Sequence, residues 1–155
     1  MQMLRTIALA LLVGFAMPVI VQAQGTATNY DQSDRQWKLV ASQITSNLEM
    51  SIDNVRTQTL RNTIIFATLY RDKVDLRRCV TALRSVYENG ANATQRKLAL
   101  AALTAIGSSG ASNYLARHVH AAEAEEGRLV VASVLNEFFL SRARAAREAA
   151  RTVTG

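Results

Sequence analysis

Proline is nearly missing from this chain, since the single proline, Pro18, lies close to the N-terminus. Aromatic residues make up only 6% of the sequence, and Cys79 is the one cysteine. A lone cysteine cannot form an internal disulfide, so a disulfide-stabilised scaffold is excluded. The apolar surroundings of Cys79 favour a buried, unreactive thiol. Because proline is absent after residue 18 while alanine and leucine are abundant, we predict an all-helical fold without long strands.

The first 23 residues have the parts of an export signal. Arg5 supplies a positive charge, residues 7–21 are mostly apolar, and Ala23 ends a Val-x-Ala sequence of the kind that signal peptidases cleave. The alternative is a retained membrane anchor, but the apolar run is shorter than the ~20 residues that a bilayer span needs and it contains Pro18. We therefore expect residues 1–23 to be removed and the protein to be periplasmic or secreted, with no transmembrane segment in the mature chain.

The remaining 132 residues are enough for one domain with a hydrophobic core. They carry 17 basic and 12 acidic side chains, which gives a net charge of +5. Composition divides them into three parts. Residues 24–33 are small and polar, and we expect them to be a flexible mature N-terminus. We expect residues 34–140 to form a helical domain and residues 141–155 to form an Arg/Ala-rich helical tail.

Apolar residues recur at spacings of three and four along six segments, as on the buried face of amphipathic helices. Asp53 is expected to cap the second of these helices and Asn92 the fourth. Short links between them make consecutive helices antiparallel neighbours. In the last segment we expect Val131, Leu135, Phe138 and Phe139 to face inward. The stripes lie at 37–48, 55–70, 76–87, 98–106, 115–122 and 131–139.

The fourth segment carries a pattern with a direct physical meaning. Small Ala99 lets a paired helix approach closely, Leu103 and Ile106 fill the seam, and Gly107 accepts the left-handed backbone that ends the helix. The first residue of the pattern opens this helix. The last two residues belong to the helix that follows: the small one begins that helix, and the leucine packs back against the helix before it. The full pattern comprises Arg96, Ala99, Leu103, Ile106, Gly107, Ala111 and Leu115.

This pattern resembles the short HEAT-like repeat first named from phycobilisome lyases. The resemblance implies a right-handed stack of about three antiparallel helix pairs, an α-solenoid fragment, and a compact helical bundle is the alternative. Looser copies begin at Arg56 and Arg128, with Thr63 in the place of Leu103. Some relatives in that family are chromophore lyases. Because the resemblance covers structural positions alone, it gives no reason to expect lyase activity in this chain.

The sequence offers little that could support catalysis. His118 and His120 lie two positions apart, so on one helix they point to opposite faces and cannot share a metal ion. Glu123, Glu125 and Glu126 are expected to favour the start of the next helix through its dipole. Nucleophile elbows, phosphate-binding loops and zinc-protease motifs are all missing from the sequence. We therefore expect no enzymatic activity, no cofactor and no metal.

The first functional hypothesis is an exported protein–protein interaction or scaffolding module whose partner is another protein. The alternative is an envelope surface-binding protein that uses its basic tail on anionic lipid or polymer. Arg144, Arg147 and Arg151 recur at spacings of three and four, so a continued helix places them on one face. Nucleic acid is not expected as a partner, since export removes the usual targets and no aromatics are interleaved for stacking.

Overall fold

The computed structural model describes residues 34–90 and 92–153 of the chain, and the expected signal and mature N-terminus lie outside them. The described residues form six α-helices and one short 3-10 helix with no strand among them, which confirms the predicted all-helical class. The described residues divide between two units, one that ends at residue 140 and one formed by residues 141–153. They are treated separately below.

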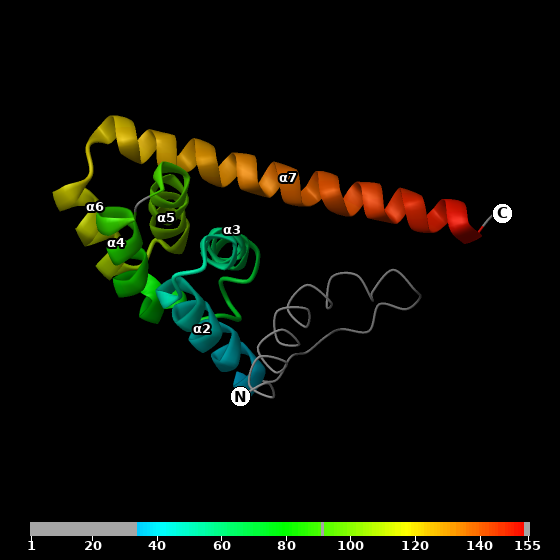
Figure 1. Cartoon of the computed structure of the whole chain (residues 1–155), viewed down its shortest axis with the longest axis horizontal. Helices are drawn as coiled ribbons and strands as arrows, with labels where there is room; N and C mark the ends of the chain where they lie inside the picture. The colour runs from blue at the N-terminus through cyan, green and yellow to red at the C-terminus, as the bar shows by residue number, and fades with distance from the viewer. Residues whose placement is uncertain (1–33, 91, 154–155) are drawn as a thin grey trace. The chain divides into compact units, whose positions relative to one another are not determined.

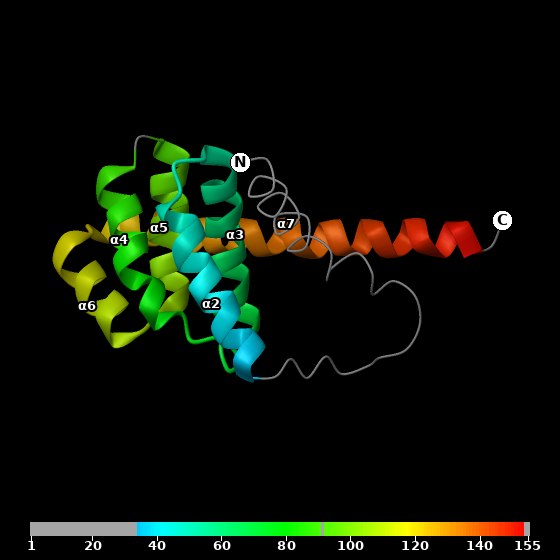
Figure 2. The ribbon, with the colours of Figure 1, turned by 60° about the horizontal axis from the view of Figure 1, so that its bottom comes forward.

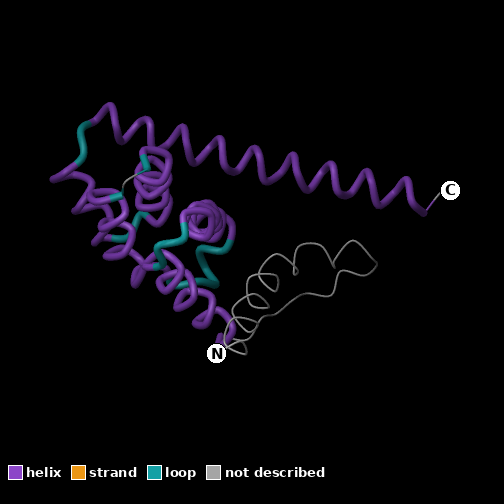
Figure 3. The backbone as a smooth tube through the Cα atoms, viewed as in Figure 1, coloured by secondary structure: helices purple, strands orange, loops and turns teal. Residues whose placement is uncertain are grey.

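The helices follow the predicted stripes, with differences at three ends. The third helix begins with a 3-10 turn, the fifth ends before Val119, and the sixth starts five residues earlier than the expected Glu126. Figure 3 shows that short loops join successive helices. The elements are α2 (Asp34–Glu49), α3 (Asp53–Leu69), η2 (Leu76–Cys79), α4 (Val80–Asn89), α5 (Ala93–Ile106), α6 (Ser109–His118) and α7 (Ala121–Val153), and Figure 1 labels the six α-helices.

Within residues 31–140, helices α2, α4 and α6 touch in that order. α2 packs on α4, and the rings of Tyr87 in α4 and Tyr114 in α6 meet edge to face at 6.3 Å. A second set runs beside the first, where α3 packs on α5 and Lys97 of α5 forms an ion pair with Glu126 of α7 at 2.5 Å. α2 also packs on α3, and α4 on α5, so the two sets are joined along their length (Figure 2).

α5 lies at the centre of the hydrophobic core. Ala99, Ala101, Ala102 and Leu103 have no exposed surface, because neighbouring helices cover α5 on several sides. Alanines at these positions allow the helices to approach closely, and larger side chains from α2, α3 and α4 fill the space between them. The largest of these are Ile44, Leu48, Leu60, Ile64 and Leu83, each at most 2% exposed.

The buried face of α7 differs from the prediction. Val134 is the buried hydrophobic residue there, and Phe139 is 52% exposed. The other three expected residues, Val131, Leu135 and Phe138, are partly buried. Gly127 and Val130 lie seven and four residues before Val134, so these positions form one helical face. Phe139 lies five residues beyond Val134, about 140° around the helix, which turns it away from that face.

One helix end differs from the expected cap. The residue before α3 is Ile52, whose side chain makes no capping bond, and Asp53 is the first helical residue. Asn92 does cap α5, since its side chain accepts a hydrogen bond from the Thr94 amide at 2.8 Å. Gly90 is the C-cap of α4, and this position needs a glycine because a Cβ there would lie 2.4 Å from the Val86 carbonyl oxygen.

Candidate functional site: two hollows beside the α3–η2 loop

The residues of the repeat pattern gather around α5 and α6. Ala99, Leu103 and Ala111 are fully buried, while Ile106 and Leu115 are partly buried and pack against the core. Their burial gives them a structural role in the seam between these helices.

The remaining two residues of the pattern act on the backbone. Gly107 ends α5 in the left-handed conformation, with φ at +56°, as its place in the pattern predicts. Arg96 donates from Nη1 to the Gly90 carbonyl oxygen at 2.6 Å, across the link between α4 and α5. Both residues therefore fix where one helix ends and the next begins.

A second arginine repeats this contact. Arg56 and Arg96 are each the fourth residue of their helix. Arg56 donates from Nε to the Leu48 carbonyl oxygen at 3.1 Å, near the end of α2, as Arg96 does at the end of α4. A cation at a helix C-terminus interacts favourably with the helix dipole. Arg128, the third expected copy, instead pairs with Glu125 one turn earlier in α7, at 2.8 Å.

The histidines and the acidic cluster make ordinary surface contacts. His118 and His120 are both exposed. Glu123 Oε2 accepts a hydrogen bond from the His120 amide at 3.3 Å at the start of α7, so the capping prediction holds for this residue. Glu125 and Glu126 form ion pairs instead. Within the described ranges, no three His, Cys, Asp or Glu side chains come together as possible metal ligands.

Cys79 is buried, as the sequence indicates. Its Sγ atom lies 3.4 Å from Thr45 Oγ1 and 3.7 Å from the Ala41 carbonyl oxygen. Burial raises the pKa of the thiol. These contacts tie the end of η2 to the inner face of α2.

The basic tail belongs to the other unit. α7 continues through Val153, so Arg144, Arg147 and Arg151 are helical, and all three are exposed. Their spacing places them on one face of α7.

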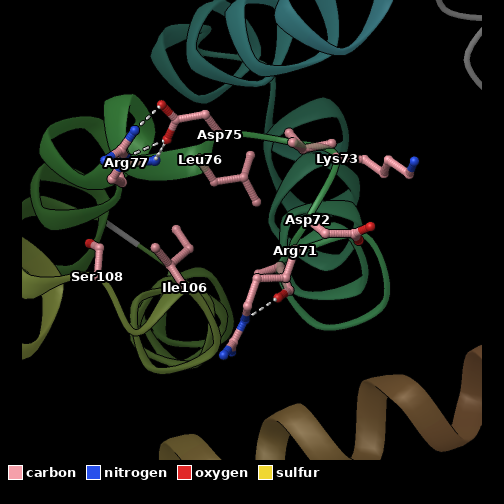
Figure 4. A pocket seen from close by; sticks show the side chains of 10 residues that line it. Arg71, Asp72, Lys73, Asp75, Leu76, Arg77, Ile106 and Ser108 are labelled. Carbon is pink, nitrogen blue, oxygen red and sulfur yellow. Dashed lines mark hydrogen bonds and ion pairs between the residues drawn. The ribbon is translucent and has the colours of Figure 1, made fainter. Parts of the chain in front are cut away.

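The first of two hollows opens where α3, η2 and α5 meet. This docking hollow has a volume of about 380 Å³. Leu76 and Ile106 point into it from two sides in Figure 4, and Val74 adds to its apolar lining. Charged side chains surround this apolar floor, among them Arg71 and Arg77. The hollow can therefore accept an apolar group beside polar contacts at its rim.

Two arginines give the rim of the docking hollow its shape. Arg71 donates from Nη2 to the Ala105 carbonyl oxygen at 2.9 Å, which fastens the end of α3 to the end of α5. Arg77 holds Asp75 through two side-chain hydrogen bonds of 2.8 Å, and its amide donates a third at 3.1 Å. These hydrogen bonds lower the pKa of Asp75 to about 2, so its carboxylate stays ionised and paired.

The second hollow, the cationic hollow, lies between α2 and the segment 73–78 and has a volume of about 420 Å³. Lys38, Lys73 and Arg78 line it, together with the hydroxyl groups of Ser42 and Ser46. Neither hollow was expected from the sequence, because the residues that line each hollow come from separate segments of the chain. The available signal was the spacing of four that puts Lys38, Ser42 and Ser46 on one face of α2.

No family model, curated protein or solved structure matches this chain. Among the helices formed by residues 34–90 and 92–153, none combines the length and the apolar character needed to cross a membrane. A function for this protein is therefore inferred below from the contacts, burial and charge of its own residues.

Proposed function

We propose that this chain is an exported, non-enzymatic module that binds another protein through three HEAT-like helix pairs. The pairs are α2 with α3, α4 with α5, and α6 with α7. In a helical solenoid each repeat contacts its neighbours in sequence, which keeps successive pairs in register. The contacts of α2 with α4, of α4 with α6 and of α3 with α5 support this order, as does the ion pair between α5 and α7.

The matching arginines support a repeated unit. Arg56 and Arg96 stand at the same position of the second helix in the first two pairs, and each binds a carbonyl at the end of the first helix. The helix dipole favours a cation at the C-terminal end of either first helix, and the shared position of the two arginines in their helices is what the repeat adds. The third pair lacks this contact, and terminal repeats of such stacks are commonly atypical.

The docking hollow is the observation that carries protein binding. It combines a volume of about 380 Å³ with an apolar floor and a charged rim. Partner proteins anchor themselves by placing one apolar or aromatic side chain in such a pocket, while polar contacts surround it. Arg71 is already bonded to the Ala105 carbonyl oxygen, so the rim keeps its shape before a partner arrives.

The second candidate function is attachment to an anionic envelope surface through the tail. The observation that favours it is the exposed helical face of Arg144, Arg147 and Arg151. Binding of this kind depends on charge and weakens as ionic strength rises. Docking of an apolar side chain depends far less on salt.

One experiment separates the two candidates. The mature protein is immobilised and exposed to an envelope fraction at low and at physiological salt, beside a variant that carries R144Q, R147Q and R151Q. We expect both proteins to retain the same partner protein at both salt concentrations. If retention occurs at low salt alone and is lost in the triple variant, the tail is the binding element and the protein-docking proposal is wrong.

A further inference from the structure

We propose that the cationic hollow binds the phosphate or carboxylate group of a small organic anion. The hollow brings together Lys38 from α2, Lys73 from the loop after α3, and Arg78 from η2. It shares a wall with the docking hollow but has its own lining on α2, so either hollow can work without the other.

The charge of this hollow is only partly offset from within. The carboxylate that also lines it, Asp75, is already held by both side-chain hydrogen bonds from Arg77. In the part of the chain that the structure describes, none of Lys38, Lys73 and Arg78 forms an ion pair. Three cations around one hollow repel each other when it is empty, and an anion placed among them relieves that repulsion.

The α2 side of the hollow supplies hydrogen-bond donors. Lys38, Ser42 and Ser46 follow one another at spacings of four, so they line one face of the helix, and Thr45 lies beside them. Thr45 Oγ1 donates to the Ala41 carbonyl oxygen at 3.2 Å, whereas Ser42 and Ser46 are exposed. Hydroxyl and ammonium donors on one wall and a guanidinium group on the other suit an oxyanion with several acceptor oxygens.

The size of the hollow indicates that the anion is part of a larger molecule. A volume of about 420 Å³ falls in the range of small-molecule sites, roughly 300–1,000 Å³. Trp37 and Ala41 give the hollow an apolar wall. The Trp37 ring is held by Tyr70 at 5.7 Å and by Phe66 at 6.5 Å, so this wall is rigid. The organic part of the ligand can lie against it while its charged group faces the cations.

The test uses the mature protein and three probes: inorganic phosphate, pyrophosphate and succinate. Each is titrated at low ionic strength, with heat release and the fluorescence of Trp37, the single tryptophan, as readouts. The site variant carries K73Q and R78Q. The matched control carries R117Q and R128Q, two exposed arginines outside both the hollow and the basic tail, and therefore loses the same charge. Circular dichroism checks that both variants keep their helices.

We expect saturable binding of at least one probe to the parent and to the control. Since the site variant loses two hydrogen bonds to a charged group, it should bind about tenfold or more weakly. Preference for pyrophosphate over succinate identifies a phosphate ligand, and the reverse a carboxylate ligand. The proposal is overturned if no probe binds the parent, or if site and control variants weaken equally, because the attraction is then one of overall charge.

Discussion

Gly127 is the residue whose replacement most directly tests how α7 packs on α5. A Cβ at this position would lie 3.1 Å from Thr104 Oγ1 and 3.2 Å from Leu100 Cγ, closer than ordinary contact. Thr104 Oγ1 is held by its hydrogen bond to the Leu100 carbonyl oxygen at 2.9 Å, and Leu100 is 3% exposed, so neither neighbour can move freely. The substitution Gly127→Val would add two further methyl groups to this contact.

The two opposing effects of Gly127→Val can be estimated. Overpacking a well-packed contact costs about 1–3 kcal/mol. Valine has a better helix propensity than glycine by a few tenths of a kcal/mol. The free energy of unfolding should therefore fall by about 1–2 kcal/mol, which urea denaturation followed by circular dichroism measures directly.

Gly110 provides the matched control within the same protein. It lies in the first turn of α6, and a Cβ there would meet nothing within 4 Å. Gly110→Ala should therefore be neutral or stabilising, by up to about 1 kcal/mol. If Gly127→Val proves as stable as Gly110→Ala, α7 does not rest on α5 through this face, and the third helix pair is wrongly placed.

Three further predictions concern single features of the chain. Leu103→Asp puts an unpaired carboxylate at a site with no exposed surface and should cost about 4 kcal/mol or more, so a mutant that melts at the parent temperature would show that the seam is misassigned. Burial and the hydrogen bond to Glu88 raise the pKa of Tyr114 from 10.0 to about 12. Since the folded-state pKa is the higher one, this contribution to stability is complete below pH 10 and is lost as the pH rises toward 12. Tyr114→Phe should make unfolding less dependent on pH in that range, and an unchanged dependence would argue against this assignment. Residues 1–23 should be missing from the exported protein, and mass spectrometry that finds them attached would refute the export signal.

Much of the helical framework could be predicted from the sequence. The stripes through Trp37, Ile44, Leu60 and Leu83 follow the helical period, and the structure buries all four residues. Gly107 was predictable for a different reason, because a glycine directly after an apolar helix suits the left-handed backbone found there. Local chemistry determines features of this kind.

Features that depend on the packing of distant segments could not be predicted. The sequence offers both Phe139 and Val134 as core residues, and the packing of α7 on the rest of the fold buries Val134 and leaves Phe139 exposed. The cations of the second hollow are separated by up to 40 positions, between Lys38 and Arg78, and meet through the fold alone. A sequence pattern read along one helix carries no information of that kind.

Protein binding through the docking hollow is tested most directly by the affinity for the partner recovered from the envelope. Ile106→Ala removes part of the hollow's apolar floor, and Leu115→Ala removes a comparable side chain that packs on the core outside it. Both side chains are partly buried, so both variants should lose similar stability. With the purified partner, we expect Ile106→Ala to weaken binding about tenfold or more, as for loss of an anchor contact, and Leu115→Ala to leave it unchanged. Equal affinity of the two variants would contradict docking at this hollow.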